Sequence, residues 1–493
     1  MVTIKIKKLG KKPTMTGQTK PTKSYRTFAL ILLTVVYGFN FIDRQIVGIL
    51  APFIQADLEL DNTQLGLLIG LAFAVFYTVV AIPIAWLADR YNRVNILSIA
   101  LATWSGFTAL TGMATNFLQI GLARMGVGIG EAGGSPPSHS IISDMYPKEE
   151  RASALGVYSM GIPLGIMAAY FATAILMGSG EDVNWRRIFI FLGLTGIALA
   201  VLVKLVLREP MRGAMEFSDQ TEIEEPPFME SLQTLMKIPA WWAMCFGIAF
   251  GSFVSYSKSA FHTKYLIALD PSIVTMCKEE ICISIWSKLE ILFTQGVVYD
   301  FQTLVIILGV VNGTTYAGGA FFGARLADKW GKKDIRAYGW LPAISIALCL
   351  PIGVAAWWST SIEMNLVFTT LFLLFMGVYL GPSFAIAQTL APINMRAMST
   401  ALFFFILNMI ALGGGPTFSG WLIDVFKENN GEIESIRYAM TVTSLLFIPS
   451  IISFLIVARV LPKNWAEAEK RNLDLAPGLI GQPSNKLSER KLT

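Results

Sequence analysis

Charged residues are scarce in this chain. They make up 15% of its 493 residues, whereas a soluble globular chain carries about 25%. Hydrophobic residues reach 54%. With so little polar surface to cover a body in water, a soluble multidomain protein is excluded. The apolar remainder must face hydrocarbon, so the lipid bilayer is the first partner that we expect.

Cysteine and histidine are also rare, at four and two residues. No spacing among them matches a metal site, and neither a Walker loop nor a nucleophile–base arrangement is visible. We therefore expect no enzyme, no ATP-driven pump and no cofactor. Cys245 and Cys349 fall in apolar segments, where we expect inert packing. Cys277 and Cys282 lie in a loop, and the sequence does not choose between a disulfide and two free thiols.

Long apolar segments recur along the whole chain. A bilayer core about 30 Å thick requires roughly 20 apolar residues in a spanning helix. Helices are expected because they close their backbone hydrogen bonds internally, and the short alternating strands of a barrel are missing. The prediction is an all-α membrane protein with twelve helices, at 26–52, 63–87, 94–115, 117–143, 153–177, 186–207, 240–263, 302–326, 335–358, 363–390, 398–423 and 436–460.

The distribution of Lys and Arg predicts the orientation in the membrane. The short loops near 88–94 and 327–336 carry Lys and Arg, as does the C-terminal tail, whereas 53–62 carries three acids and neither cation. Both termini are therefore expected in the cytoplasm, and the short loops favour a bacterial inner membrane. The net charge of +5 reflects this asymmetry. We expect no nucleic-acid partner, since no basic helix or aromatic stacking platform is present.

An internal duplication divides the helices into two halves. Asp89 follows the second predicted helix as Asp328 follows the eighth, at an offset of 328 − 89 = 239 residues. Three further residues recur 245 positions later, with Pro137, Pro147 and Arg151 matching Pro382, Pro392 and Arg396. Duplicated halves of this kind usually enclose a substrate site near mid-membrane and rock about it.

The duplication predicts five divisions of the chain. They are a cytoplasmic tail at 1–25, a six-helix bundle at 26–208, a linker with an amphipathic helix at 209–239, a second six-helix bundle at 240–460 and a cytoplasmic tail at 461–493. The second bundle includes an outward loop at 264–301, in which four apolar residues predict a short interfacial helix.

The duplicated loops resemble the cytoplasmic signature loops of the major facilitator superfamily. Their charged residues are Asp89, Arg90, Arg93, Asp328, Lys329 and Lys332. Family members usually have Gly where this chain has Ala85, Asn92 and Ala324, but the charges are kept. The resemblance implies a cytoplasmic gate that these charges hold closed. The alternative is that they only anchor the loops on the cytoplasmic side.

Two further motifs resemble the spinster family. One is residues 40–44 in the first helix, which read NFIDR, and the other is residues 128–131 in the fourth, which read GIGE. Arg124, four residues before Gly128, is also similar to a motif of proton-coupled facilitators. The spinster resemblance implies lipid-like or sugar-like substrates.

Charged side chains inside a bilayer are costly and therefore functional candidates. Asp43 lies nine residues before Pro52, about 13 Å from the outer end of its helix. Arg124 lies seven residues after Phe117, about 10 Å from the same end. This shared depth predicts an Asp43–Arg124 pair. Arg44 is expected to point elsewhere, either to snorkel or to bind an anionic headgroup.

Glu131 is seven residues beyond Arg124, so both project from one face of the helix. Near the midplane its carboxyl group is expected to take up and release a proton as the cavity opens and closes. Asp43, Glu131 and Arg124 are therefore predicted to couple transport to protons. The alternative is an ion pair that only positions the first and fourth helices.

Substrate contacts are predicted at Glu131, Arg124, Asn40, Asn312 and Asn408. Asn312 and Asn408 have an equal alternative role in bonding helix to helix. Lys258 is placed near the outer end of the seventh helix, where its side chain can snorkel.

The predicted function is secondary transport, driven by a proton gradient, of an amphipathic lipid-like or small organic substrate. We expect a monomer. The alternatives are an uncoupled lipid facilitator, a proton-coupled sugar or organic-anion transporter, and a transporter-like receptor without flux.

Overall fold

The computed structural model describes residues 22–177, 183–211, 228–275, 300–392 and 395–475. All regular structure within these residues is helical. The first half contains α1 (Lys23–Ile49), α2 (Ala51–Asp57), α3 (Asn62–Ile69), α4 (Leu71–Arg90), α5 (Arg93–Thr111), α6 (Phe117–Glu131), α7 (Ser135–Met145), α8 (Lys148–Ser159), α9 (Gly161–Leu176) and α10 (Trp185–Val206).

The linker contains α11 (Phe228–Met236), and the second half follows it. Its helices are α12 (Pro239–Leu269), α13 (Ser272–Thr275), α15 (Phe301–Gly331), α16 (Ala337–Trp357), α17 (Ile362–Val378), α18 (Leu380–Thr389), α19 (Arg396–Leu407), the π-helix η3 (Asn408–Gly413), α20 (Gly414–Lys427), α21 (Glu432–Ser444) and α22 (Phe447–Leu475).

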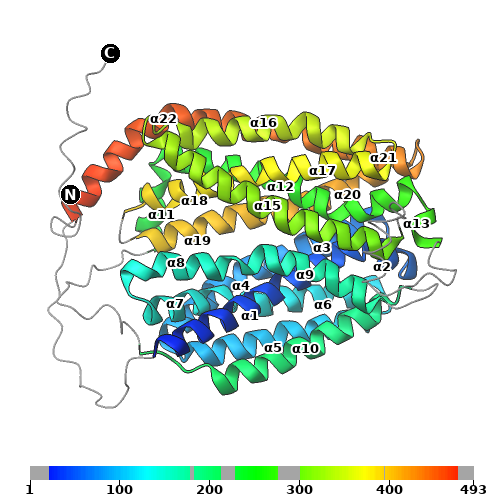
Figure 1. The fold of residues 1–493 in the computed structure, drawn as a ribbon, viewed down its shortest axis with the longest axis horizontal. Helices are drawn as coiled ribbons and strands as arrows, with labels where there is room; N and C mark the ends of the chain where they lie inside the picture. The colour runs from blue at the N-terminus through cyan, green and yellow to red at the C-terminus, as the bar shows by residue number, and fades with distance from the viewer. Residues whose placement is uncertain (1–21, 178–182, 212–227, 276–299, 393–394, 476–493) are drawn as a thin grey trace.

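These helices form twelve membrane spans. Ten helices or consecutive helix pairs are long and apolar enough to cross a bilayer. Two more, α6 continued by α7 and the long α12, run through the bundle beside them (Figure 1). The predicted all-α fold with two six-helix halves is confirmed, although several spans are broken near their middle.

The boundaries that differ most from the prediction are two C-terminal ends. The seventh span continues as α12 to Leu269, beyond the expected end at residue 263, and the last continues as α22 to Leu475, beyond residue 460. Both extensions carry charged residues, which lower the hydropathy on which the prediction relied. Cys277, Cys282 and the expected interfacial helix of the outward loop lie outside the described residues.

The two halves lie side by side, with α1–α10 in one and α12–α22 in the other (Figure 1). We call the end where α1 begins and α22 ends the terminal side, and the end with α2 and α13 the far side. One buried cluster joins both halves toward the far side, for example Ile46 and Leu65 with Phe261, Leu304 and Leu422. Toward the terminal side each half has a core almost entirely its own.

The two halves approach each other closely between α3 and α20. A Cβ atom at Gly66 would lie 2.3 Å from the backbone oxygen of Pro416, and one at Gly420 would lie 2.1 Å from that of Asn62. Glycine therefore allows the two backbones to touch here. The helix pairs α9–α15, α4–η3, α1–α12 and α2–α12 also join the halves.

Candidate functional site

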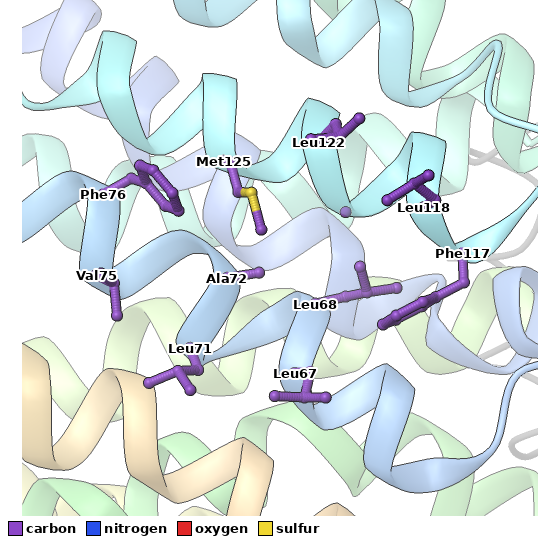
Figure 2. Close-up of a pocket in the computed structure, with 11 residues that line it drawn as sticks. Leu67, Leu68, Leu71, Ala72, Val75, Phe76, Phe117, Leu118, Leu122 and Met125 are labelled. Carbon is purple, nitrogen blue, oxygen red and sulfur yellow. The ribbon is translucent and has the colours of Figure 1, made fainter.

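One hollow in the bundle is an apolar crevice of about 300 Å³ between α3, α4 and α6 (Figure 2). Leu118 and Leu122 at its rim are 68% and 55% exposed. In a spanning helix such side chains face the acyl chains. No ionisable group lines the crevice, so it has nothing to orient a polar substrate.

The second hollow, of about 170 Å³, lies between the two halves. We call it the central cavity. Its walls carry several polar side chains as well as Phe and Tyr rings. The polar residues are Arg44, Gln45, Arg124, Ser252, Ser255, Lys258, Ser259, His262, Asn312 and Thr369. A concave site with an aromatic wall and a few convergent polar groups fits a small-molecule ligand, so this cavity is the candidate site.

Arg44 forms the ion pair at the centre of the first half. Its Nε lies 2.7 Å from Oε2 of Glu131, and the two side chains are 13% and 0% exposed. The guanidinium also lies 4.3 Å from the ring centroid of Tyr77. Of the two roles expected for Arg44, snorkelling is therefore wrong, and binding an anionic headgroup stays a prediction.

Arg124 does not pair with the Asp43 carboxylate in this structure, so that predicted pair is wrong here. Its Nη1 lies 3.5 Å from the backbone oxygen of Asp43, and the Asp43 side chain lies beside Thr108. The depth argument holds, since the two residues meet. Residues 43 and 44 differ by 100° around the helix, however, and spacing alone does not decide which of them faces α6.

Three buried atoms around this ion pair have no hydrogen-bond partner within the described residues. They are Oδ1 of Asn40, Nε of Arg124 and Oε1 of Glu131. Arg124 and Glu131 are 2% and 1% exposed. Unsatisfied polar atoms at such depth are costly, and they are expected where a ligand or proton binds during function.

The three Asn residues predicted to contact the substrate lie in different surroundings. Asn40 is buried beside Glu131. Asn312 lines the central cavity, while its Nδ2 donates to the backbone oxygen of Leu308 at 2.8 Å. Asn408 is buried at the start of η3 and is absent from the cavity lining. A π-helix turn inside a span is often found at functional sites.

The first signature loop is tied to its own half. Arg93 is 1% exposed, and it donates from Nε to Glu209 at 2.7 Å and from Nη1 to Asp144. Arg90 is exposed and lies 4.0 Å from the ring centroid of Trp86. The side chain of Asp89 is outside the described residues.

The second signature loop is more open. Asp328 accepts a hydrogen bond from the Tyr338 hydroxyl at 2.7 Å, and Lys329 and Lys332 are exposed. Among the residues that the structure describes, no charged side chain of either loop forms an ion pair with the opposite half.

A polar network holds the halves together on the far side. Asp424 of α20 accepts hydrogen bonds from the backbone N–H groups of Asn62 and Thr63 at 3.1 and 2.7 Å, and from their side chains at 2.6 Å each. These are first-turn amides of α3, so one half caps a helix of the other. We call Asp424, Asn62 and Thr63, together with Lys264 and its partners, the far-side latch.

Lys264 of α12 is the cation of the latch. Its Nζ donates to Gln55 at 2.7 Å, lies 3.2 Å from Glu432 and also bonds Asn62. The latch was not predicted. Lys264 and Asp424 lie near the ends of apolar segments, where charge is ordinary, and the sequence carries no sign that they meet.

The prediction also placed Lys258 wrongly. It is 5% exposed and lines the central cavity, so it does not snorkel. Its Nζ donates to the Thr369 hydroxyl at 3.0 Å and lies 4.9 Å from the ring centroid of Trp357. The signal that pointed inward is the run of polar residues at helical spacing on α12, where Ser255 and His262 share a face with Lys258.

The sequence and structure were compared with known proteins. The family model of the Major Facilitator Superfamily matches residues 33–406. An MFS-type efflux pump of Mycolicibacterium smegmatis is 28% identical over 408 residues, covering 82% of this chain and 86% of that protein. Protein spinster homolog 1 of Xenopus tropicalis is 24% identical over 468 residues, with 92% and 85% coverage.

A solved structure has the same fold. It is a bacterial homolog of the human lysosomal transporter spinster, in an inward-facing and unoccupied conformation. It is 28% identical, has a TM-score of 0.78 and is matched over 90% of this chain and 99% of that one.

Proposed function

Because this chain belongs to the major facilitator superfamily, as a spinster-like member, we propose that it is a proton-coupled transporter of an amphipathic organic substrate. The membrane fold and transport as the general activity follow from the family. The proton as driving ion and the substrate class are our proposal. The observation that carries it is the buried Arg44–Glu131 ion pair at the wall of the central cavity.

The proposed coupling step is protonation of Glu131. A carboxylate at 0% exposure is stable only with a partner, and Arg44 is that partner. Adding a proton to Glu131 removes its charge and frees the Arg44 guanidinium. Arg44 lines the central cavity, so its release changes the charge that the substrate meets.

Asp43 is the second proposed proton carrier. It is 3% exposed and lies beside Thr108, and the structure gives its side chain no ion pair within the described residues. A buried carboxyl group without a cation avoids a large desolvation cost by holding a proton. Arg124, which already contacts the Asp43 backbone, would compensate the charge after the proton leaves.

The structure is proposed to represent the inward-facing state. The far side is closed by a shared apolar core and the latch, while each half keeps a separate core toward the terminal side. If both termini are cytoplasmic, as the loop charges predict, this cavity opens inward. The signature-loop charges would then pair across the halves only in the outward-facing state, and the membrane would be a bacterial inner membrane.

Reconstitution in proteoliposomes with an imposed pH gradient tests the coupling. The probes are lysophosphatidic acid, D-galactonate and ethidium, and a trapped pH dye reports proton movement. We expect the wild-type protein to accumulate one of these probes against its gradient. Glu131→Gln and Asp43→Asn should abolish accumulation while leaving exchange of labelled for unlabelled probe intact, because exchange needs no net proton transfer.

The alternatives give different results in the same vesicles. Flux that ignores the gradient in the wild-type protein would indicate an uncoupled facilitator. Binding without flux would indicate a receptor. If gradient-driven accumulation is unchanged in both variants, the proposed roles of Glu131 and Asp43 are wrong. Lys204→Met, at an exposed position on α10, is the control for reconstitution.

A further inference from the structure

Resting on the proposed transport function, we propose that Lys258 and Thr369 form a subsite in the second half that binds an anionic group of the substrate. We call these two residues, with His262 beside them, the Lys258 subsite. All three line the central cavity. The substrate class is thus narrowed to organic anions, with a phosphate or carboxylate group at one end.

The balance of charged residues around the cavity favours an anionic ligand. In the first half Asp43 and Glu131 offset Arg44 and Arg124, so that cluster is neutral when both acids are ionised and positive when either is protonated. Lys258 has no such offset, since no ion pair involves it in the described part of the chain, and an anionic ligand would stabilise its ammonium form. A cavity between the halves that carries an unmatched cation attracts an anionic ligand.

The ammonium group of Lys258 also has unused hydrogen-bonding capacity. A lysine has three N–H donors, and the one partner found among the described residues is the Thr369 hydroxyl at 3.0 Å. Lys258 is only 5% exposed to solvent. Two free donors at that depth are the arrangement that a ligand oxygen would satisfy.

The neighbours of Lys258 hold it in place without neutralising it. Trp357 and Phe372 present ring centroids at 4.9 and 5.5 Å from Nζ, which is cation–π distance. His262, one turn along α12, bonds Asn365 at 2.8 Å and lies 3.4 Å from the Thr369 hydroxyl. These contacts fix the position of the ammonium group and leave its charge for a ligand.

The cationic residues that line the cavity belong to both halves, so a bound anion can connect the two halves. Arg44 and Arg124 belong to α1 and α6, whereas Lys258 and Thr369 belong to α12 and α17. An anion held by Lys258 on one wall meets the arginines on the other wall, so it links the two halves that move in alternating access. The rings nearby suit the apolar part of the same molecule.

Binding at one fixed pH, with no gradient, tests the subsite. Purified protein in nanodiscs is titrated with two matched pairs: lysophosphatidic acid against the monoacylglycerol of the same chain, and D-galactonate against D-galactose. We expect the wild-type protein to prefer the anion of at least one pair. Lys258→Met should weaken that anion by about 10- to 100-fold, the size expected for a lost hydrogen bond to a charged group. It should leave the neutral partner unchanged.

Further variants distinguish the effect of losing the positive charge from an effect on folding. Lys258→Arg keeps the charge and should retain most of the preference, and Thr369→Val should reduce it less than Lys258→Met does. The exposed Lys204→Met makes the same chemical change away from the cavity and should match the wild-type protein. If Lys258→Met is unstable in thermal unfolding, Lys258→Gln replaces it.

The two anions distinguish the source of the acidic group. If only lysophosphatidic acid is preferred over its neutral partner, the subsite binds the phosphate of a lipid. If only D-galactonate is preferred, the subsite binds the carboxylate of a sugar acid. The subsite is overturned if the wild-type protein prefers neither anion, or if Lys258→Met weakens charged and neutral members equally. Loss of proton dependence in vesicles would leave these binding results standing, so failure of the two proposals can be told apart.

Discussion

Glu131 shows how much one buried residue depends on its neighbour. Its side chain is 0% exposed, one oxygen is bonded to Arg44 at 2.7 Å, and the other has no partner among the described residues. It is also the last residue of α6, where the helix dipole is unfavourable to negative charge. The ion pair with Arg44 is therefore the main compensation that this carboxylate has.

Removing Arg44 should destabilise the protein strongly. Arg44→Met leaves Glu131 buried without its cation, and breaking a buried pair in this way costs about 3–5 kcal/mol. We expect a clear fall in the thermal unfolding temperature in detergent. The double variant Arg44→Met with Glu131→Gln should recover much of the loss, because the unpaired charge is gone.

The double variant is the decisive comparison. If it is no more stable than Arg44→Met alone, the loss comes from packing of Arg44 against the Tyr77 ring and not from the unpaired carboxylate. Arg90→Met, which removes an exposed arginine from a tryptophan face, is the control.

At this scale the sequence located the important residues but not their partners. Intramembrane charge is costly wherever it occurs. A charged residue within a long apolar segment was therefore enough to identify Asp43, Arg124 and Glu131 as candidates. Which of Asp43 and Arg44 faces Glu131 depends on the rotation of α1 about its axis. Tertiary packing decides that rotation. The helical spacing of charged residues does not reveal it, because Asp43 and Arg44 are adjacent and both are charged.

Among the elements, α6 owes its position to small residues. A Cβ atom at Gly130 would lie 2.5 Å from the backbone nitrogen of Trp104, and one at Gly128 would lie 2.7 Å from the backbone oxygen of Phe73. The helix therefore touches the backbones of α4 and α5. Gly130 directly precedes Glu131, so this close packing holds the acid deep in the half, beside the Arg44 that lines the cavity.

Two Gly→Ala substitutions should have opposite effects. Gly130→Ala places a methyl group against the backbone of α5 and should lower the unfolding temperature by several degrees, with loss of Glu131-dependent transport. Gly106→Ala meets no heavy atom within 4 Å. It should be neutral or stabilising by about 0.4–1 kcal/mol, since alanine restricts the unfolded chain. Equal effects at both positions would show that close approach of α6 is unimportant.

The helices themselves were predictable and their breaks were not. A run of apolar residues long enough for the bilayer predicts a span, because an unpaired backbone group in hydrocarbon is too costly. Breaks such as the one between α3 and α4 at Gly70, or the π-helix η3, depend on a neighbouring backbone. A Cβ atom at Gly70 would lie 2.7 Å from the backbone oxygen of Gly413, a contact between segments far apart in the chain.

At the scale of the whole molecule, the two ends of the bundle are unequal. The far side joins both halves through one buried cluster and the latch, while the terminal side leaves each half with its own core. The duplication in the sequence predicts two halves. It does not predict which end is closed, because one sequence must stabilise both states nearly equally.

Loss of the latch should shift the balance between these states. Asp424→Ala removes the acceptor of four hydrogen bonds from Asn62 and Thr63. We expect the fraction of molecules open on the far side to rise by about tenfold. Spin labels on α2 and α13 would report this as a longer distance population.

The matched control is Glu428→Ala, which removes an exposed acid just after α20. It should leave the distance distribution unchanged. If Asp424→Ala also leaves it unchanged, the apolar contacts between α3 and α20 close the far side without help from the latch.

The makeup of the latch has a consequence for turnover. Asp424 and Thr63 are only partly buried, and Glu432 is 50% exposed. When the halves part, water can take over most of the hydrogen bonds that the latch loses, so the net free energy of breaking it is small. A seal made only of interlocking hydrocarbon side chains would resist opening more strongly. By closing the rim with polar groups that water can solvate once the halves part, the protein keeps its two states close in energy and can pass between them in every cycle.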